Sequence, residues 1–147
     1  KQQCLISTLK KIASTYLKIG YPIKALEIFE KIYIINETAF GEEDPRTLAA
    51  LNRLAVNYGL LGDYLKAKEL REKVYTLRSS GLGEDHIDTM RTLYGLAVIY
   101  DAIGNYQKAL EMQEKLYGIQ CKVFGVYHEK TLHTVQLIKE LKEKFLI

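Results

Sequence analysis

The chain has 147 residues, of which 48% are hydrophobic and 27% charged, a composition typical of one ordinary globular domain. The 21 basic and 18 acidic residues leave a net charge of only +3, and the two signs alternate along the chain. This balance argues against a nucleic-acid-binding surface. No apolar run approaches the ~20 residues that cross a bilayer. We therefore expect neither a nucleic-acid nor a membrane partner.

The two cysteines, Cys4 and Cys121, lie far apart in the chain. This pattern predicts no disulfide and a reducing, cytoplasmic location. The N-terminal segment has no signal-peptide pattern. Because the chain begins with Lys1 rather than Met, we expect it to be a fragment of a longer protein.

The first expected unit, at about 5–43, is a pair of helices. Its first helix is predicted to end at Gly20, because glycine readily adopts the left-handed conformation that terminates helices. The second helix is predicted to begin at Pro22, where proline is tolerated because first-turn amides have no partner within the helix. It should end before Gly41.

The second expected unit, at about 44–85, has the same design. Asp44 and Pro45 form a typical helix N-terminus. Leu51, Ala55 and other apolar residues spaced by three and four then share one helical face. A break at Gly62 separates this helix from a second amphipathic helix.

The unit repeats with a period of 42 residues and without gaps. A shift of 42 in either direction relates the first, second and third units, the last at about 86–127. The matched positions include Leu9, Leu51 and Leu93; Ala13, Ala55 and Ala97; Tyr16, Tyr58 and Tyr100; and Gly20, Gly62 and Gly104. A fixed period of this length in a helical sequence predicts a solenoid.

The remaining segment, 130–147, aligns only with the first helix of a unit. The repeated alanine and tyrosine are replaced there by Lys139 and Lys142, so we expect a terminal capping helix. The hydrophobic end, Phe145 to Ile147, is unusual for a free terminus. Self-association through the chain ends is therefore one option for this protein.

The motif Leu-x-x-Leu-Ala-x-x-Tyr-x-x-x-Gly-x-Tyr-x-x-Ala, at 51–67, resembles the tetratricopeptide repeat. The 42-residue period and the closing segments at 41–47, 83–89 and 125–131 resemble the longer kinesin-light-chain type. This resemblance implies an all-α fold: a right-handed α-solenoid of stacked helix-turn-helix repeats with seven helices in one domain, 1–147.

Catalytic signals are weak in this sequence. His86 and His128 occupy matching turns one repeat apart, too far from each other to share one metal ion. The glycines stand singly rather than in a phosphate-binding loop. No nucleophile has a histidine at a readable motif spacing. We therefore expect no enzyme, no catalytic residue, no metal and no cofactor.

In the repeats that this chain resembles, the first helix of each pair lines a concave surface that binds partners. The resemblance thus implies a protein- or peptide-binding groove lined by Lys10, Lys11, Ser14, Asn52, Arg53, Val56, Arg91, Tyr94, Val98, Asp101 and Gln136. Basic side chains surround small apolar positions in this set, which favours a peptide with acidic groups and an apolar anchor.

The predicted function is accordingly a non-catalytic protein–protein interaction scaffold. Two alternatives remain open. The chain could be a ligand- or peptide-sensing arm of a larger regulatory protein that carries an ATPase or DNA-binding domain elsewhere. It could also be a spacer between other domains.

Overall fold

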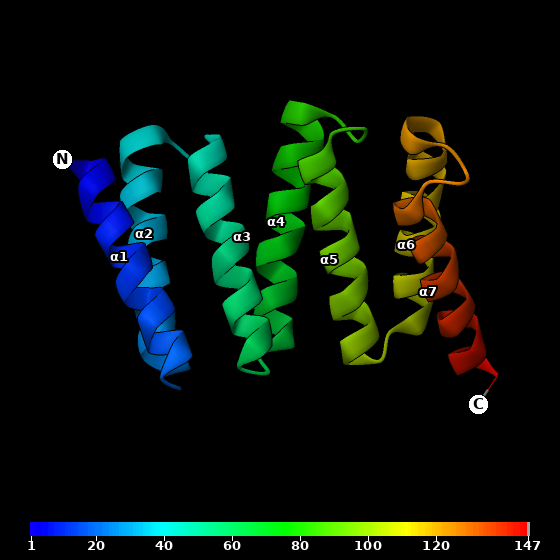
Figure 1. Cartoon of the computed structure of the whole chain (residues 1–147), viewed down its shortest axis with the longest axis horizontal. Coiled ribbons are helices and arrows are strands. Elements are labelled where there is room, and N and C mark those ends of the chain that lie inside the picture. The colour runs from blue at the N-terminus through cyan, green and yellow to red at the C-terminus, as the bar shows by residue number, and fades with distance from the viewer. Residues whose placement is uncertain (147) are drawn as a thin grey trace. The chain divides into compact units, whose positions relative to one another are not determined.

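The computed structural model describes residues 1–146, which form seven α-helices and no strand (Figure 1). This confirms the all-α prediction and its number of helices. The helices are α1 (Gln2–Lys18), α2 (Pro22–Phe40), α3 (Pro45–Leu60), α4 (Tyr64–Leu82), α5 (Ile87–Ile103), α6 (Tyr106–Phe124) and α7 (Glu129–Phe145). We call α1, α3, α5 and α7 the A helices, and α2, α4 and α6 the B helices.

The chain divides into two compact units, and we describe each by itself. Unit 1 comprises Lys1–Leu70 and unit 2 begins at Arg71, so the division falls inside α4. The assignment of the whole chain to one domain stays a prediction. In unit 1, α2 packs against both α1 and α3. The core of unit 1 includes the buried side chains of Ile6, Phe29, Ile32, Leu51 and Leu54.

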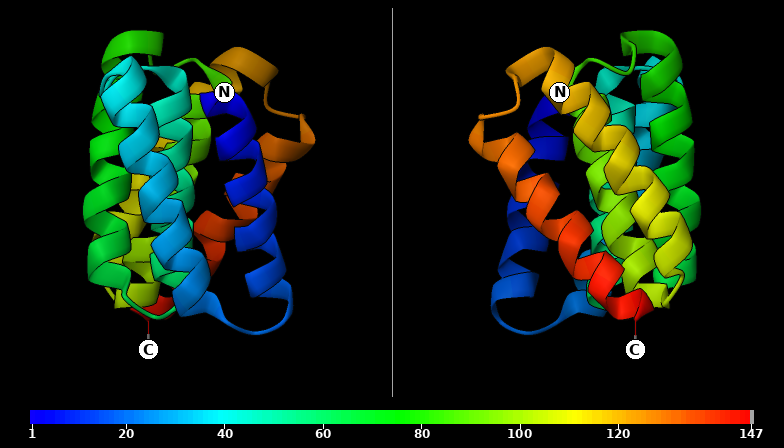
Figure 2. Two further views of the ribbon diagram at one scale, coloured as in Figure 1. Left: turned by 90° about the vertical axis from the view of Figure 1, so that its left-hand side faces the viewer. Right: turned by 90° about the vertical axis from the view of Figure 1, so that its right-hand side faces the viewer.

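In unit 2, α6 packs against both α5 and α7 (Figure 2). One core cluster contains Leu96, Tyr100, Ala109 and Leu141, and a second contains Met90, Leu93 and Leu116. The two clusters lie toward opposite ends of α5, so α5 is buried along most of its length.

Small residues stand at the predicted helix contacts. Ala13, Ala55 and Ala97 are at most 1% exposed, and Ala25 and Ala109 on the B helices are fully buried. Alanine at these positions lets neighbouring helices approach closely, so a larger side chain would have no space. Ala55, predicted to lie on the apolar face of its helix, is thus buried, and so is its repeat equivalent Ala97.

The A helices end where the glycine spacing predicts. Gly104 has φ +94° and ψ +5°, the left-handed conformation, and its N–H donates to the carbonyl oxygen of Asp101 at 3.0 Å. The corresponding Gly62 has φ +87°. Turns of this kind direct α2 back along α1 and α6 back along α5.

The A helices after the first share one N-terminal design. Asp44 caps α3, as predicted, and its carboxylate accepts a hydrogen bond from the Arg46 amide at 2.9 Å. His86 and His128 occupy the matching positions. Their Nδ1 atoms accept from the amides of Asp88 and Lys130 at 3.0 and 3.1 Å. The two histidines are therefore N-caps.

Helix α7 exposes apolar side chains that its counterparts bury. Leu132 and Val135 are 51% and 43% exposed, whereas Leu93, which corresponds to Val135, is buried. Phe145 and Leu146 are also exposed, and Ile147 lies outside the described residues.

Candidate functional site

A pocket of about 570 Å³ lies in unit 2 between α5, α6 and α7. We call it the α5–α7 pocket. It is lined by Ile87, Met90, Arg91, Tyr94, Leu116, Gln120, Phe124, Glu129, Lys130, His133 and Thr134. Its volume falls in the range of pockets that hold a ligand or a large side chain.

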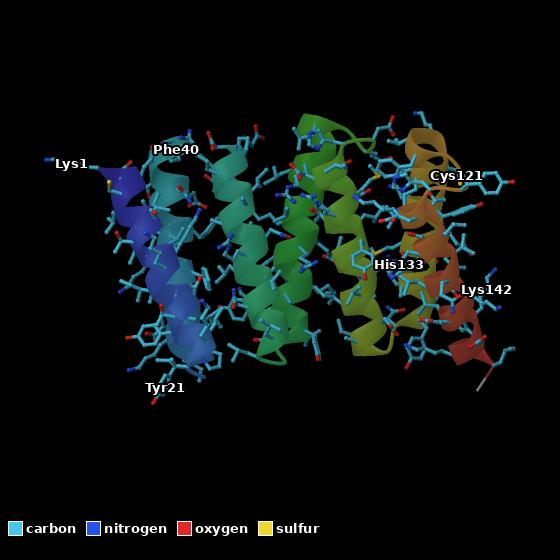
Figure 3. All side chains as sticks on the ribbon, viewed as in Figure 1. Lys1, Tyr21, Phe40, Cys121, His133 and Lys142 are labelled. Carbon is cyan, nitrogen blue, oxygen red and sulfur yellow. The ribbon has the colours of Figure 1, made fainter. Side chains whose placement is uncertain are left out.

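Aromatic and cationic groups are in contact around this pocket. The Tyr94 and His133 ring centroids are 6.2 Å apart, and Figure 3 shows His133 projecting from α7 toward α5. The ammonium group of Lys130 lies 5.6 Å from the centre of the Phe124 ring. Arg91 is exposed, and its guanidinium lies 3.4 Å from the carboxylate of Asp88. The cations of Arg91 and Lys130 and the carboxylate of Glu129 thus border a largely apolar wall.

One buried polar side chain also lines the pocket. Gln120 is buried, and its Oε1 atom has no hydrogen-bond partner among the described residues. A buried acceptor without a partner is costly, and a ligand N–H or a water molecule would satisfy it. The α5–α7 pocket therefore offers an acceptor as well as its basic and apolar groups.

Unit 1 contains a second hollow of about 360 Å³, which we call the α1–α3 hollow. It lies between α1, α2 and α3. Its lining is Gln3, Ile6, Ser7, Lys10, Phe29, Ile32, Asn36, Phe40, Arg46, Ala49, Ala50 and Arg53.

The two hollows occupy the same place in the repeat. For ten of the twelve residues that line the α1–α3 hollow, the residue 84 positions later, or two periods of 42, lines the α5–α7 pocket. Ile6 becomes Met90, Asn36 becomes Gln120, and Phe40 becomes Phe124. Each unit therefore builds a concave site from an A helix, its B helix and the next A helix.

Basic groups also surround the α1–α3 hollow. The Arg46 guanidinium lies 3.4 Å from the centre of the Phe40 ring and forms two hydrogen bonds with Asp44, at 2.9 and 3.0 Å. Hydrogen bonds from Arg46 hold the pKa of Asp44 below its ordinary value. Lys10 and Arg53 add two further exposed cations to the lining.

The structure brings some of the predicted groove residues together. Lys10 and Arg53 line the α1–α3 hollow, and Arg91 and Tyr94 line the α5–α7 pocket. Val98 and Asp101 line a smaller hollow of about 50 Å³. Lys11, Ser14, Val56 and Gln136 are exposed but do not line these three hollows.

Asn52 and Asp101, two of the residues predicted to line an open groove, are less available to a partner than expected. Asn52 is half-buried rather than exposed, and its Oδ1 atom has no hydrogen-bond partner among the described residues. Asp101 accepts a hydrogen bond from Lys144 of α7, and this bond raises the pKa of Lys144. Asp101 is thus already paired within unit 2.

Sequence reasoning missed the walls that the B helices supply. Asn36 and Gln120 are buried polar residues on otherwise apolar helix faces, and Arg78 stands at the matching position of α4. Arg78 donates to Thr92 Oγ1 at 2.8 Å and to the Asp88 carbonyl oxygen at 3.3 Å. A polar residue that recurs every 42 positions among apolar neighbours was the signal that could have found them.

Helical hairpins that recur every 42 residues and share repeat-equivalent hollows define a repeat protein of the α-solenoid class. A model of the tetratricopeptide repeat matches residues 4–80 and 47–122. The chain belongs to the tetratricopeptide-repeat family, and its repeats are of the kinesin-light-chain-like type. Repeats of this family are protein-interaction scaffolds and typically not catalytic.

Solved structures agree with this assignment. The nearly identical TPR-like repeats of a Podosopora anserina protein assigned to the kinesin light chains match with a TM-score of 0.81 at 26% identity, over 92% of this chain and 64% of that one. BtubC from P. vanneervenii matches with a TM-score of 0.80 at 18% identity, over 97% of this chain and 57% of that one, which shows the fold alone. The chain thus spans less than two thirds of either structure. No curated protein sequence matches it.

Residues 1–146 contain neither a candidate membrane span nor a candidate metal-binding cluster. No helix there is long and apolar enough to cross a membrane. No group of three or more His, Cys, Asp or Glu side chains there is placed to hold a metal ion.

Proposed function

We propose that this chain is a scaffold that holds a segment of a partner protein against its A helices. An apolar side chain of the partner occupies the α5–α7 pocket, and acidic side chains beside it face the basic groups around that pocket. The single observation that carries this proposal is the recurrence of one concave, basic-rimmed site at the same repeat position in both units.

The chemistry of the pocket supports a peptide ligand. Met90, Leu116 and Phe124 offer apolar surface, which favours a large apolar side chain by removing it from water. Arg91 and Lys130 offer charge-assisted hydrogen bonds to carboxylates, which are stronger than neutral ones. Tyr94 adds a rigid aromatic surface of the kind found at binding hot spots.

We infer a binding role rather than catalysis for this pocket. The Thr134 hydroxyl donates to the Lys130 carbonyl oxygen at 3.1 Å, so it serves its own helix. The Lys130 amide in turn donates to Nδ1 of His128, so this histidine caps the N-terminus of α7. These groups therefore stabilise the pocket wall.

The test is a selection of random 12-residue peptides on the immobilised protein, followed by affinity measurements on the enriched sequences. We expect the enriched peptides to combine acidic residues with a large apolar residue. Reversing one groove charge in each unit, in the double variant R53E/R91E, should weaken their binding by at least about tenfold, because each charge-assisted bond contributes about 1.5–3 kcal/mol.

The matched control is K66E/K108E, which makes the same charge change in each unit at exposed B-helix positions. It should alter the affinity by less than about twofold, which is under 0.5 kcal/mol. Equal weakening by both double variants would show that net charge, rather than the groove, controls binding. Enrichment without acidic residues would also contradict the proposal.

A further inference from the structure

The arginine at position 71 occupies space that a side chain at position 95 would need. Arg71 extends from α4 onto α5, and its Nη1 atom lies only 1.3 Å from where a Cβ atom on Gly95 would be. Both residues belong to unit 2. Gly95 does not have a positive φ, so the turn geometry that favours other glycines does not explain it. In this structure the guanidinium fills the space beside Gly95, and a side chain at position 95 would force it to move.

The other repeats show what this pair replaces. The positions that match Gly95 hold long side chains, namely Lys11, Arg53 and Leu137, and those that match Arg71 hold Phe29 and Gln113. In unit 1 the Arg53 guanidinium lies 5.9 Å from the centre of the buried Phe29 ring. There the B helix contributes the buried residue and the A helix the cation. In unit 2 the B helix contributes the cation, and the matching position of the A helix is a glycine, which has no side chain.

The Arg71 guanidinium is partly buried and has no anionic partner within residues 1–146. Its Nε atom is buried without a hydrogen-bond partner among the described residues, and burial lowers the pKa of Arg71. Arg78, seven residues later on the same helix, is also partly buried but donates to two oxygen atoms. An unpaired charge in such a position is costly, and a carboxylate would offset much of that cost.

The position of Gly95 relates this guanidinium to the proposed groove. Gly95 follows Arg91 by one helical turn and precedes Val98 by almost one turn, so these residues share a face of α5. Arg91 and Val98 are both exposed. Gly95 itself is buried under Arg71, so an anion held by the Arg71 guanidinium would lie beside the exposed residues Arg91 and Tyr94 of α5.

We propose that Arg71 binds a carboxylate of the partner through its guanidinium, which lies over Gly95 where the other A helices carry a long side chain. This inference rests on the proposed function and adds a contact that no A-helix residue supplies. Arg71 is suited to this role because its planar guanidinium can hold both carboxylate oxygens in parallel hydrogen bonds. The ligand class is an acidic side chain of a peptide, and a free dicarboxylate has the same chemistry.

The experiment follows the Nε–Hε signals of the arginines by NMR in the full 147-residue chain labelled with ¹⁵N-arginine. Disodium glutarate is the first probe, titrated at constant ionic strength against sodium chloride. We expect the Arg71 signal, assigned by its loss in R71K, to shift and saturate. The signals of Arg46 and Arg78, which already have oxygen partners, should shift only slightly.

G95A is the decisive variant, because its Cβ atom must displace the guanidinium while alanine keeps the helix favourable. We expect a helical circular dichroism spectrum like that of the wild type and loss of the saturable glutarate shift. A second arm uses the peptides enriched by the selection above. R71K and G95A should weaken their binding several-fold if the carboxylate belongs to the peptide, whereas a site for free dicarboxylates alone would leave peptide affinity unchanged.

These experiments test the Arg71 site independently of the proposed binding function. If the Arg71 signal shifts no more than those of Arg46 and Arg78, or if G95A retains the saturable shift, Arg71 is not the carboxylate-binding residue. The groove proposal would still stand if R53E/R91E lost the enriched peptides. If Arg71 bound glutarate but R53E/R91E retained every peptide, the groove proposal would fall and the anion site would remain.

Discussion

Histidine serves as a helix cap in this chain, in a position where aspartate serves in the preceding repeat. Asp44 and His86 are 42 residues apart, and each accepts a hydrogen bond from the amide two residues later. An imidazole can accept at Nδ1 only when that nitrogen carries no proton. The sequence indicated a turn residue at His86 but not this role, because histidine is not among the commonest N-cap residues.

Replacing His86 with alanine should remove the cap of α5 and lower the free energy of unfolding by about 1 kcal/mol. His86→Asp should keep most of that stability, because a carboxylate can accept the same amide, as Asp44 does. Urea unfolding at pH 8 measures both variants. The cap assignment would be wrong if the alanine and aspartate variants unfolded at the same urea concentration.

Two repeat-equivalent tyrosines are hydrogen-bonded as well as packed. Tyr58 donates to Glu30 at 2.7 Å in unit 1, and Tyr100 donates to Glu72 in unit 2. The hydrogen bond to Glu30, followed by burial, raises the pKa of Tyr58 to about 12. Burial, followed by the hydrogen bond to Glu72, raises the pKa of Tyr100 to about 12. Each pair links a B helix to the next A helix.

The folded protein should therefore lose stability at high pH. Because the folded-state pKa values lie above the ordinary value of 10, the stabilisation is complete below pH 10 and is lost as the pH rises toward 12. An absorbance titration at 295 nm should show late-titrating tyrosines that disappear in Y58F/Y100F. Titration of every tyrosine near pH 10, in protein that circular dichroism shows to be folded, would contradict these pairs.

At the scale of the helices, the first three A helices each bury an alanine at the same repeat position, namely Ala13, Ala55 and Ala97. Ala97 of α5 is 1% exposed. Replacing Ala97 with leucine should overpack this contact and lower the free energy of unfolding by about 1–3 kcal/mol. Lys108→Ala, at an exposed position of α6, should change it by less than about 0.5 kcal/mol.

Chemical denaturation of the two variants, compared with the wild type, checks these values. Similar losses from A97L and K108A would mean that the buried and exposed faces are assigned incorrectly. No change from A97L would mean that the helices can separate at this contact without cost.

The helices were predictable because their ends depend on local chemistry. A glycine such as Gly104 terminates a helix whatever surrounds it, and the 42-residue period makes that signal recur. The alanine contacts were predictable for the same reason. The exposure of apolar residues on α7, such as Leu132, was harder to predict from the sequence, because it depends on which helix packs beside them.

At the scale of the whole molecule, the sequence predicted only part of the candidate site. Spacing along one helix is enough to place Arg91 and Tyr94 on a common face. It does not show that Gln120 and Phe124 of α6 complete the same pocket, because that depends on how three helices pack. The contact between Arg71 and Gly95 could not be predicted either, because it depends on how the Arg71 side chain of α4 lies against α5.

The central claim is that partners bind along the A helices and enter the α5–α7 pocket. The most direct measurement is a ¹H–¹⁵N NMR titration of the full chain with the tightest acidic peptide from the selection. We expect large shifts at Arg91, Tyr94 and His133, and small ones at the exposed B-helix residues Lys108 and Glu111. The largest shifts at Lys108 and Glu111, with the pocket residues unmoved, would contradict it.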